Sequence, residues 1–209
     1  MVKSAKIIFL ISLLATPLLF SQDAYLRISD YGSSVIRIGV PDFSNKLASY
    51  SAGWDSVKNT LCEVLRNDLS FSPYLVVSEP EFYPQKSLKD VKDINPFAWA
   101  TAGIQAIVLG EFDTDGKKIG LKATLYSVSG SAKIFSKSYE CDAVQSRRLV
   151  HRVADDVHKL LTGDEGVAQT QIAFVSTRYN GTKELYVCDY DGYAPRRITE
   201  SKAIILSIR

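Results

Sequence analysis

The chain has 209 residues, of which 46% are apolar and 23% are charged. This composition is typical of a folded globular protein and excludes a disordered or fibrous chain, and the length allows one large or two small domains. The formal net charge is only +2, which gives no electrostatic reason to expect nucleic acid or an anionic membrane surface as a partner.

Residues 1–21 are predicted to form a secretory signal peptide. Two lysines precede an apolar run at residues 7–20, which Pro17 interrupts and which is too short for a good membrane span of about 20 residues. Cleavage is expected near Ser21, with an uncleaved N-terminal anchor as the alternative. No cysteine lies near the end of this segment, which argues against a lipid anchor. The exported chain would carry 23 basic and 23 acidic side chains and no integral membrane segment.

The first part of the exported chain alternates short strands and helices. Two extended segments are predicted at residues 24–29 and 35–43, and a short apolar strand at residues 73–79. Between them, residues 50–72 fit an amphipathic helix. Its expected inward face consists of Trp54, Val57, Leu61, Val64, Leu65 and Leu69. A second, short helix is predicted at residues 95–103, with Asn95 as its N-cap, Pro96 in its first position and Gly103 at its end.

Residues 104–142 give the clearest pattern in the chain, three strands joined by turns at residues 113–116 and 129–131. A last amphipathic helix follows and ends at Gly163. Its expected inward residues are Val144, Leu149, Val153, Val157, Leu160 and Leu161. The pattern therefore predicts an α/β fold, a mixed sheet with two long helices, over residues 22–163.

Candidate catalytic and metal-binding residues are few. His151 and His158 lie seven positions apart on one predicted helix, whereas paired metal ligands on a helix are spaced by three or four, and no cysteine or carboxylate completes a set in the sequence. The basic run at residues 146–152 is interpreted as a solvated helix face. Common hydrolase and nucleotide-binding motifs are missing from the sequence. We therefore expect no enzyme activity, no cofactor and no metal. Cys62, Cys141 and Cys188 are interpreted as small buried hydrophobic residues, and one disulfide among them stays open without specific support.

The remainder of the chain has another pattern. Residues 164–170 are predicted to be a linker, and residues 171–209 to contain strand, Asn-Gly turn, strand, Asp-Gly turn and third strand. This is three strands of a four-stranded unit of roughly 40 residues, the period of a β-propeller blade. The acidic stretch at residues 189–192 is interpreted as a turn, because Tyr193 occupies the position where a calcium loop needs an oxygen ligand.

Several of these stretches resemble the TolB family. The resemblance rests on IRIGVPDF (residues 36–43), NPFAWATAGIQAIVLGEF (95–112), YECDAVQSRRLVHRVADDVHKLLTG (139–163) and the strands and turns of residues 172–199. It implies the family's N-terminal α/β domain followed by an incomplete first propeller blade. Family members continue into further repeats that close the propeller, so the chain is expected to be a truncated member.

The resemblance also implies a function. TolB-like proteins are periplasmic, non-enzymatic adaptors of the Tol-Pal system, linking inner-membrane TolA to the outer-membrane lipoprotein Pal in envelope integrity and cell division. It assigns Pal binding to a complete propeller and TolA binding to an arm after the signal peptide. Here the expected arm consists of Gln22, Asp23, Ala24, Tyr25, Leu26, Arg27 and Ile28.

The arm has an alternative interpretation, as the plain first strand of the domain's own sheet. As an extended, alternating segment it could also add to a sheet edge of a partner. A monomer is expected. The alternative for the whole chain is the N-terminal fragment of a secreted, propeller-bearing peptidase or hydrolase.

Overall fold

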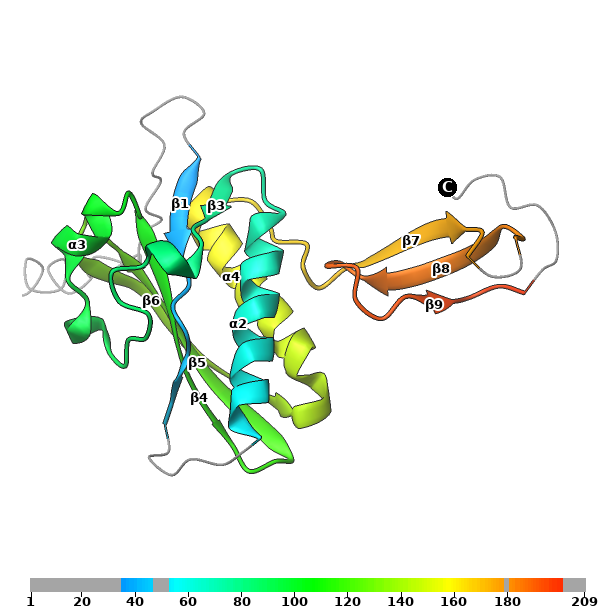
Figure 1. Cartoon of the computed structure of the whole chain (residues 1–209), viewed down its shortest axis with the longest axis horizontal. Helices are drawn as coiled ribbons and strands as arrows, with labels where there is room; N and C mark the ends of the chain where they lie inside the picture. Colours follow the sequence, from blue (N-terminus) through cyan, green and yellow to red (C-terminus); the bar gives the residue numbers. More distant parts are fainter. Residues whose placement is uncertain (1–34, 47–52, 179–180, 201–209) are drawn as a thin grey trace, which may run out of the picture.

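The computed structural model describes residues 35–46, 53–178 and 181–200 (Figure 1). The predicted signal peptide, the first predicted strand and the proposed TolA-binding arm at residues 22–28 lie outside these ranges. Within them, no helix is both long enough and apolar enough to span a membrane.

Two sheets and three α-helices make up the described structure. The larger sheet contains β1 (Ile36–Gly39), β2 (Ser44–Asn45), β3 (Leu75–Val77), β4 (Ala106–Thr114), β5 (Lys118–Ser127) and β6 (Ala132–Asp142). The helices are α2 (Trp54–Ser70), α3 (Pro96–Thr101) and α4 (Ser146–Thr162). Short 3-10 helices are η1 (Pro80–Phe82), η2 (Val91–Asp93) and η3 (Ala143–Gln145). The second sheet consists of β7 (Gln171–Ser176), β8 (Glu184–Asp189) and β9 (Arg196–Arg197).

The larger sheet is mixed, as the sequence predicts. Its strand order is β3-β1-β4-β5-β6, and β2 adds to one end of β4. β1 runs parallel to β3 and β4, whereas β4, β5 and β6 form the predicted antiparallel meander. Crossovers through helices produce the parallel pairs, and tight turns produce the antiparallel ones. The prediction of a mixed α/β fold is therefore confirmed.

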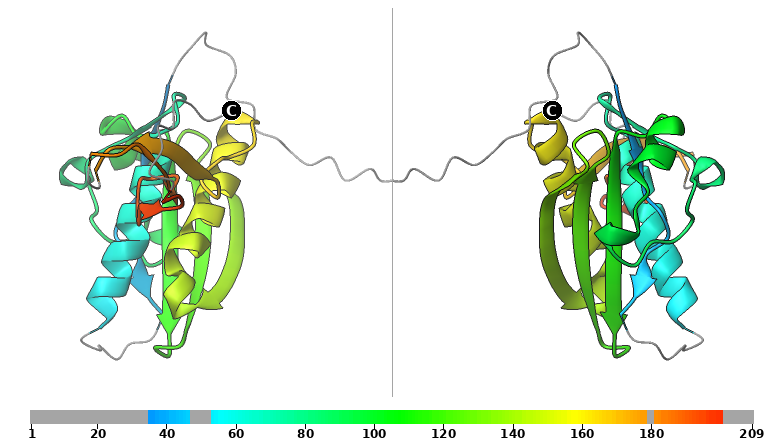
Figure 2. Two further views of the ribbon diagram at one scale, coloured as in Figure 1. Left: turned by 90° about the vertical axis from the view of Figure 1, so that its right-hand side faces the viewer. Right: turned by 90° about the vertical axis from the view of Figure 1, so that its left-hand side faces the viewer.

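Helices α2 and α4 lie side by side on one face of this sheet (Figures 1 and 2). Their apolar stripes and the facing strand residues form one core, in which Leu61, Leu65, Leu149 and Val153 are fully buried. Amphipathic helices gain most of their stability from such packing rather than from intrinsic propensity. The inward face predicted for the first helix is confirmed for Leu61, Val64, Leu65 and Leu69.

The opposite face of the sheet carries a smaller core. Trp99 of α3 is fully buried there, with Ile104, Ile107 and Tyr126 among its neighbours. Asn95 caps α3 through a hydrogen bond from the Ala98 amide, which confirms the predicted N-cap.

The prediction of the inward face of α4 is wrong for one residue. Val144 is 93% exposed, because it belongs to η3 and precedes the first turn of α4. The chain reaches helical geometry only at Ser146, so the inward stripe begins at Leu149. The helix ends where predicted, at Gly163, whose positive φ of 84° suits glycine.

Residues 164–170 connect the two sheets and are bonded to α4. The carboxylate of Asp155 accepts hydrogen bonds from the amides of Ala168 and Gln169, at 2.7 and 3.3 Å, and from the Gln169 side chain at 2.8 Å. Ala168 is 5% exposed and belongs to the main core. This connection is therefore packed rather than suspended between the sheets.

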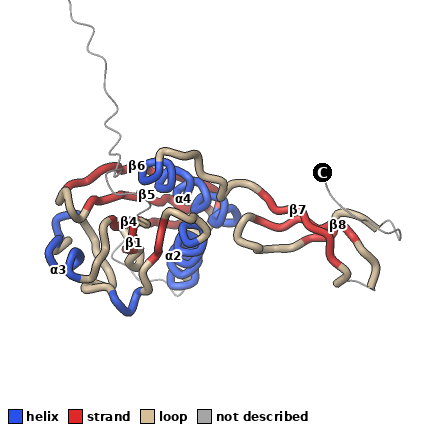
Figure 3. The backbone as a smooth tube through the Cα atoms, turned by 90° about the horizontal axis from the view of Figure 1, so that it is seen from above, coloured by secondary structure: helices blue, strands red, loops and turns tan. Residues whose placement is uncertain are grey.

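The second sheet is antiparallel, in the order β7-β8-β9. It lies beside the helices and is joined to α4 by residues 164–170 (Figures 1 and 3). Gly192, with φ of 80°, lies in the turn that follows β8, so the stretch at residues 189–192 is a turn, as predicted.

Candidate functional site

The junction between the helices and the second sheet contains a buried cluster of charged side chains, which we call the junction cluster. It consists of Asp68 on α2, Arg147 and His151 on α4, and Asp189 and Asp191 at the end of β8 and in the turn after it. The cluster thus joins three elements that are distant in the sequence.

A buried ion pair forms the inner half of the junction cluster. His151 Nδ1 lies 2.7 Å from Asp68 Oδ2, and the two residues are 4% and 5% exposed. Burial lowers the pKa of His151, but the hydrogen bond and the negative charge of Asp68 outweigh burial, so the net change raises the pKa of His151. Such a pair is costly to bury and strongly destabilising to break.

The outer half ties the turn of the second sheet to α4. Arg147 forms an ion pair with Asp191, whose side chain is almost completely buried. The guanidinium also lies over the Tyr193 ring, 3.7 Å from its centroid. Beside it, Phe71 and Tyr190 meet edge to face, with their ring centroids 5.4 Å apart. These contacts dock the turn onto the C-terminal end of α2 and the N-terminal half of α4.

The interpretation of residues 146–152 as a solvated helix face is wrong for His151 and Arg147. His151 is buried and Arg147 is half-buried, because the turn after β8 covers this part of α4. The sequence also offers no carboxylate pair that completes a metal-binding set with the histidines. The structure supplies carboxylates from α2 and from the turn, which no helical spacing relates to α4.

A signal for the inner pair is present in the sequence. Asp68 falls on the apolar stripe of α2 next to Leu69, and His151 falls on the apolar stripe of α4 between Val150 and Val153. Two ionisable residues of opposite type, each on an inward helix face, favour a buried pair. The outer partners Asp191 and Tyr193 have no comparable signal.

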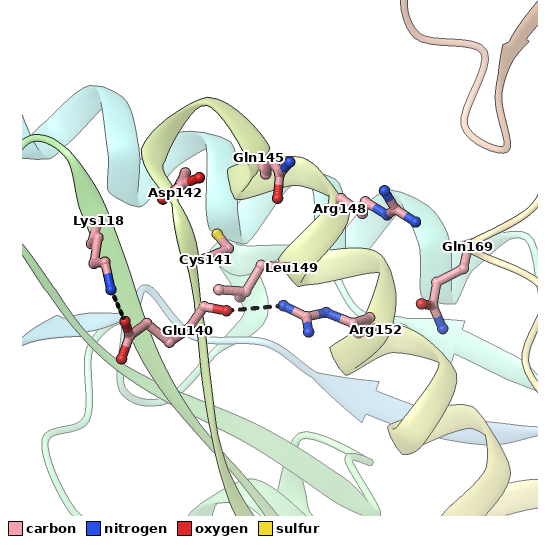
Figure 4. A pocket seen from close by; sticks show the side chains of 9 residues that line it. All are labelled: Lys118, Glu140, Cys141, Asp142, Gln145, Arg148, Leu149, Arg152 and Gln169. Atoms are coloured by element: carbon pink, nitrogen blue, oxygen red, sulfur yellow. Dashed lines mark hydrogen bonds and ion pairs between the residues drawn. The ribbon is translucent and has the colours of Figure 1, made fainter.

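A separate pocket of about 410 Å³ lies between β6 and α4 (Figure 4). We call it the β6–α4 pocket. Its side chains include Lys118, Glu140, Cys141, Arg148 and Arg152. Lys118 Nζ contacts the Glu140 carboxylate at 2.8 Å, and an Arg152 nitrogen donates to the Glu140 carbonyl at 3.3 Å. The lining is polar and of mixed charge, which suits recognition of polar groups.

The thiol in this pocket has the wrong properties for a nucleophile. Burial raises the pKa of Cys141, and the nearby Arg152 only partly offsets it, whereas catalytic thiols have a lowered pKa. Neither histidine lines the pocket. All three cysteines are free. Cys62 and Cys188 are buried, as expected from the sequence, whereas Cys141 is only partly buried.

Comparison with known proteins identifies the family. The family model "TolB amino-terminal domain" matches residues 24–134. A curated relative, the Tol-Pal system protein TolB of Desulfosudis oleivorans, is 29% identical over 99% of this chain and 47% of its own length. The protein of the same name from Geobacter sulfurreducens is 26% identical, over 97% of this chain and 46% of its own length. The chain therefore spans about half the length of these relatives.

A solved structure shares the fold. The crystal structure of TolB from Acinetobacter baumannii superposes with a TM-score of 0.67 at 24% identity, covering 83% of this chain and 41% of that one. The hydrolase alternative is not favoured, because these relatives carry Tol-Pal names. The matched domain model covers more than half of the sequence, and the chain belongs to the TolB family.

Proposed function

We propose that this chain is a periplasmic, non-enzymatic adaptor of the Tol-Pal system, linking a TolA-like protein of the inner membrane to a Pal-like lipoprotein of the outer membrane. The observation that carries the proposal is the match of residues 24–134 to the TolB amino-terminal domain. The Tol-Pal names of the relatives support the same system. In this role the chain supports envelope integrity and cell division.

The domain organisation that accompanies this proposal has four parts. Residues 1–21 are the signal peptide, residues 22–163 the N-terminal α/β domain, residues 164–170 the connection and residues 171–209 the start of the first propeller blade. The antiparallel sheet β7-β8-β9 supports the last part, since a blade is a four-stranded antiparallel sheet. Pal binding belongs to the complete propeller.

TolA binding is assigned to the arm, Gln22 to Ile28. Its alternating side chains suit addition to an exposed sheet edge, where backbone hydrogen bonds give affinity and side-chain pockets give specificity. Burial raises the pKa of Cys141 in the β6–α4 pocket, which disfavours nucleophilic catalysis by this thiol.

The test is a binding measurement between the purified chain without residues 1–21 and the C-terminal domain of TolA from the same organism. Isothermal titration calorimetry is expected to give saturable one-to-one binding. Deleting residues 22–28 should abolish it, and Arg27→Glu should weaken it. Arg178→Glu serves as the matched control, because Arg178 is exposed in the loop after β7, away from the arm in the sequence.

Two outcomes contradict the proposal. Unchanged affinity after deletion of the arm would refute the assignment of residues 22–28 and favour their role as a plain first strand. Failure of the intact chain to bind TolA would refute the adaptor role of this part of the protein.

Size-exclusion chromatography with light scattering tests the expected monomer.

A further inference from the structure

We infer that the junction cluster is a binding site for one divalent transition-metal ion of the zinc class, with His151, Asp189 and Asp191 as its protein ligands. The expectation of no metal followed from sequence spacing alone. It did not anticipate that the turn after β8 places two carboxylates beside the buried histidine.

The first observation is the convergence of donor atoms. One ring nitrogen of His151 and one carboxylate oxygen from each of Asp189 and Asp191 lie within 4.8 Å of one another. Imidazole nitrogen and carboxylate oxygen are the donors that zinc binds beside thiolate. Three protein ligands with a fourth position left for water is a common arrangement for this ion.

The second observation is independent of the acidic residues. His151 is 4% exposed, and its Nε2 is a buried atom with no hydrogen-bond partner among the described residues. Buried polar atoms are rarely left unpaired, so Nε2 marks a place where an ion or a water can bind. Since Nδ1 is engaged by Asp68, Nε2 is the nitrogen that remains available to a metal.

The contact between Asp68 and His151 has the form of a second coordination shell. A metal-binding histidine characteristically donates its other ring N–H to a carboxylate, which fixes the tautomer and strengthens the ligand. With Nδ1–H donated to Asp68, Nε2 presents a lone pair. The carboxylate oxygens of Asp189 and Asp191 also carry lone pairs and negative charge. A cation between them and Nε2 removes the repulsion among these donor atoms.

The charge balance favours a divalent ion. Asp68, Asp189 and Asp191 contribute three negative charges, and the ion pair with Arg147 supplies one positive charge. A metal at Nε2 takes the place of the proton that this nitrogen carries in the imidazolium form, and the neutral imidazole then leaves two negative charges in a largely buried cluster. One divalent cation neutralises both, whereas one proton on His151 neutralises only one.

The donor separations require a modest closure. Ligand atoms at about 2.1 Å from a tetrahedral zinc lie about 3.4 Å apart, which is shorter than the 4.8 Å limit of the cluster. Asp189 ends β8 and Asp191 lies in the turn after it, where rotation of either side chain can close this gap. Asp191 Oδ2 is paired with Arg147, and Asp191 Oδ1 accepts a hydrogen bond from the Tyr193 amide at 3.1 Å. A metal bound by Asp191 would therefore share one of these oxygens with Arg147 or with the Tyr193 amide.

The experiment uses tag-free protein without residues 1–21, stripped with a chelator and titrated with zinc sulfate in a calorimeter. We expect saturable one-to-one binding and a rise in melting temperature, with magnesium chloride producing neither. Asp189→Asn removes one ligand from a half-buried position and should weaken zinc affinity at least about tenfold. Asp68→Asn alters a positioning residue and should weaken affinity by about 10–100-fold at unchanged stoichiometry.

His158→Gln is the matched control. His158 is the other histidine of the chain and lies on the same helix, where it contacts Ser72 and Asp164 instead of the junction cluster. Its zinc affinity should equal that of the unmodified protein. The proposal is overturned if zinc shows no saturable binding, in which case a proton bridges the cluster. It is also overturned if Asp189→Asn binds zinc as tightly as His158→Gln.

Discussion

Replacement of Asp155 by alanine should destabilise the protein by about 2 kcal/mol. The Asp155 carboxylate accepts three hydrogen bonds from residues 168 and 169. The shortest comes from the amide of Ala168, which lies in the main core and would lose its partner. A buried donor without a partner lowers the free energy of unfolding by about 1–3 kcal/mol, and a fully buried hydrogen bond to a charged group contributes about 1.5–3 kcal/mol to it. Asp155 is only half-buried, which reduces the contribution of the two bonds from Gln169.

Alanine also favours the helix, which returns up to about 0.7 kcal/mol within α4. The net loss of about 2 kcal/mol corresponds to a melting temperature lower by about 4–8 °C for a chain of this size. Thermal unfolding followed by circular dichroism measures this loss, and limited proteolysis should show faster cleavage within residues 164–170. Asp164→Ala is the control, because Asp164 is exposed in the same segment and its bonds use backbone atoms. Equal melting temperatures and equal cleavage rates for the two variants would show that the Asp155 carboxylate does not hold this segment.

Three further predictions test the packing. Gly166→Ala should lower the melting temperature, because the new Cβ would overlap the α4 backbone at Asp155. Gly53→Ala is the control, since a Cβ there meets nothing within 4 Å, and equal melting temperatures of the two variants would contradict the close approach of Gly166 to α4. Val144→Asp should leave the free energy of unfolding within about 0.5 kcal/mol of that of the unmodified protein. Val153→Asp, at a fully buried position, should abolish cooperative unfolding. A large loss of stability in Val144→Asp would show that Val144 faces the core. Burial raises the pKa of Cys62 to about 11, so iodoacetamide at neutral pH should leave it unmodified in mass spectrometry of the native protein, and rapid modification would refute its burial.

The strand and helix order of the larger sheet is predictable because each element carries its own signal. The meander has alternating strands and tight turns, and the paired strands β4, β5 and β6 follow one another directly. The stripe of α2 repeats at spacings of three and four and is buried as expected. Asn95 and Pro96 mark the start of α3 through local backbone chemistry alone. Such signals need no knowledge of tertiary contacts.

Val144 shows where a local signal misleads. It continues the apolar spacing of α4 backwards by one turn, yet the chain there adopts a 3-10 turn and exposes the side chain. Helix periodicity assigns a face only to residues that are in the helix, and the position of the first turn is the least certain part of such a prediction.

The junction cluster was harder to predict for a different reason. Its members come from α2, α4 and the turn after β8, and only folding brings them together. The hydrogen bond between His151 and Asp68 joins residues that are 83 positions apart. Helical spacing relates only residues of one element and so predicts no partner for either histidine.

The polar character of this junction has a structural consequence. Two apolar surfaces can pack in several orientations at similar free energy, whereas a buried ion pair is favourable only in the geometry that satisfies both partners. Arg147 and Asp191 meet beside the Tyr193 ring, and Phe71 meets Tyr190 at the end of α2. The turn after β8 is therefore held by contacts that specify direction as well as proximity. The junction cluster therefore supplies a physical means to fix the angle between the second sheet and the helices that cover the larger sheet.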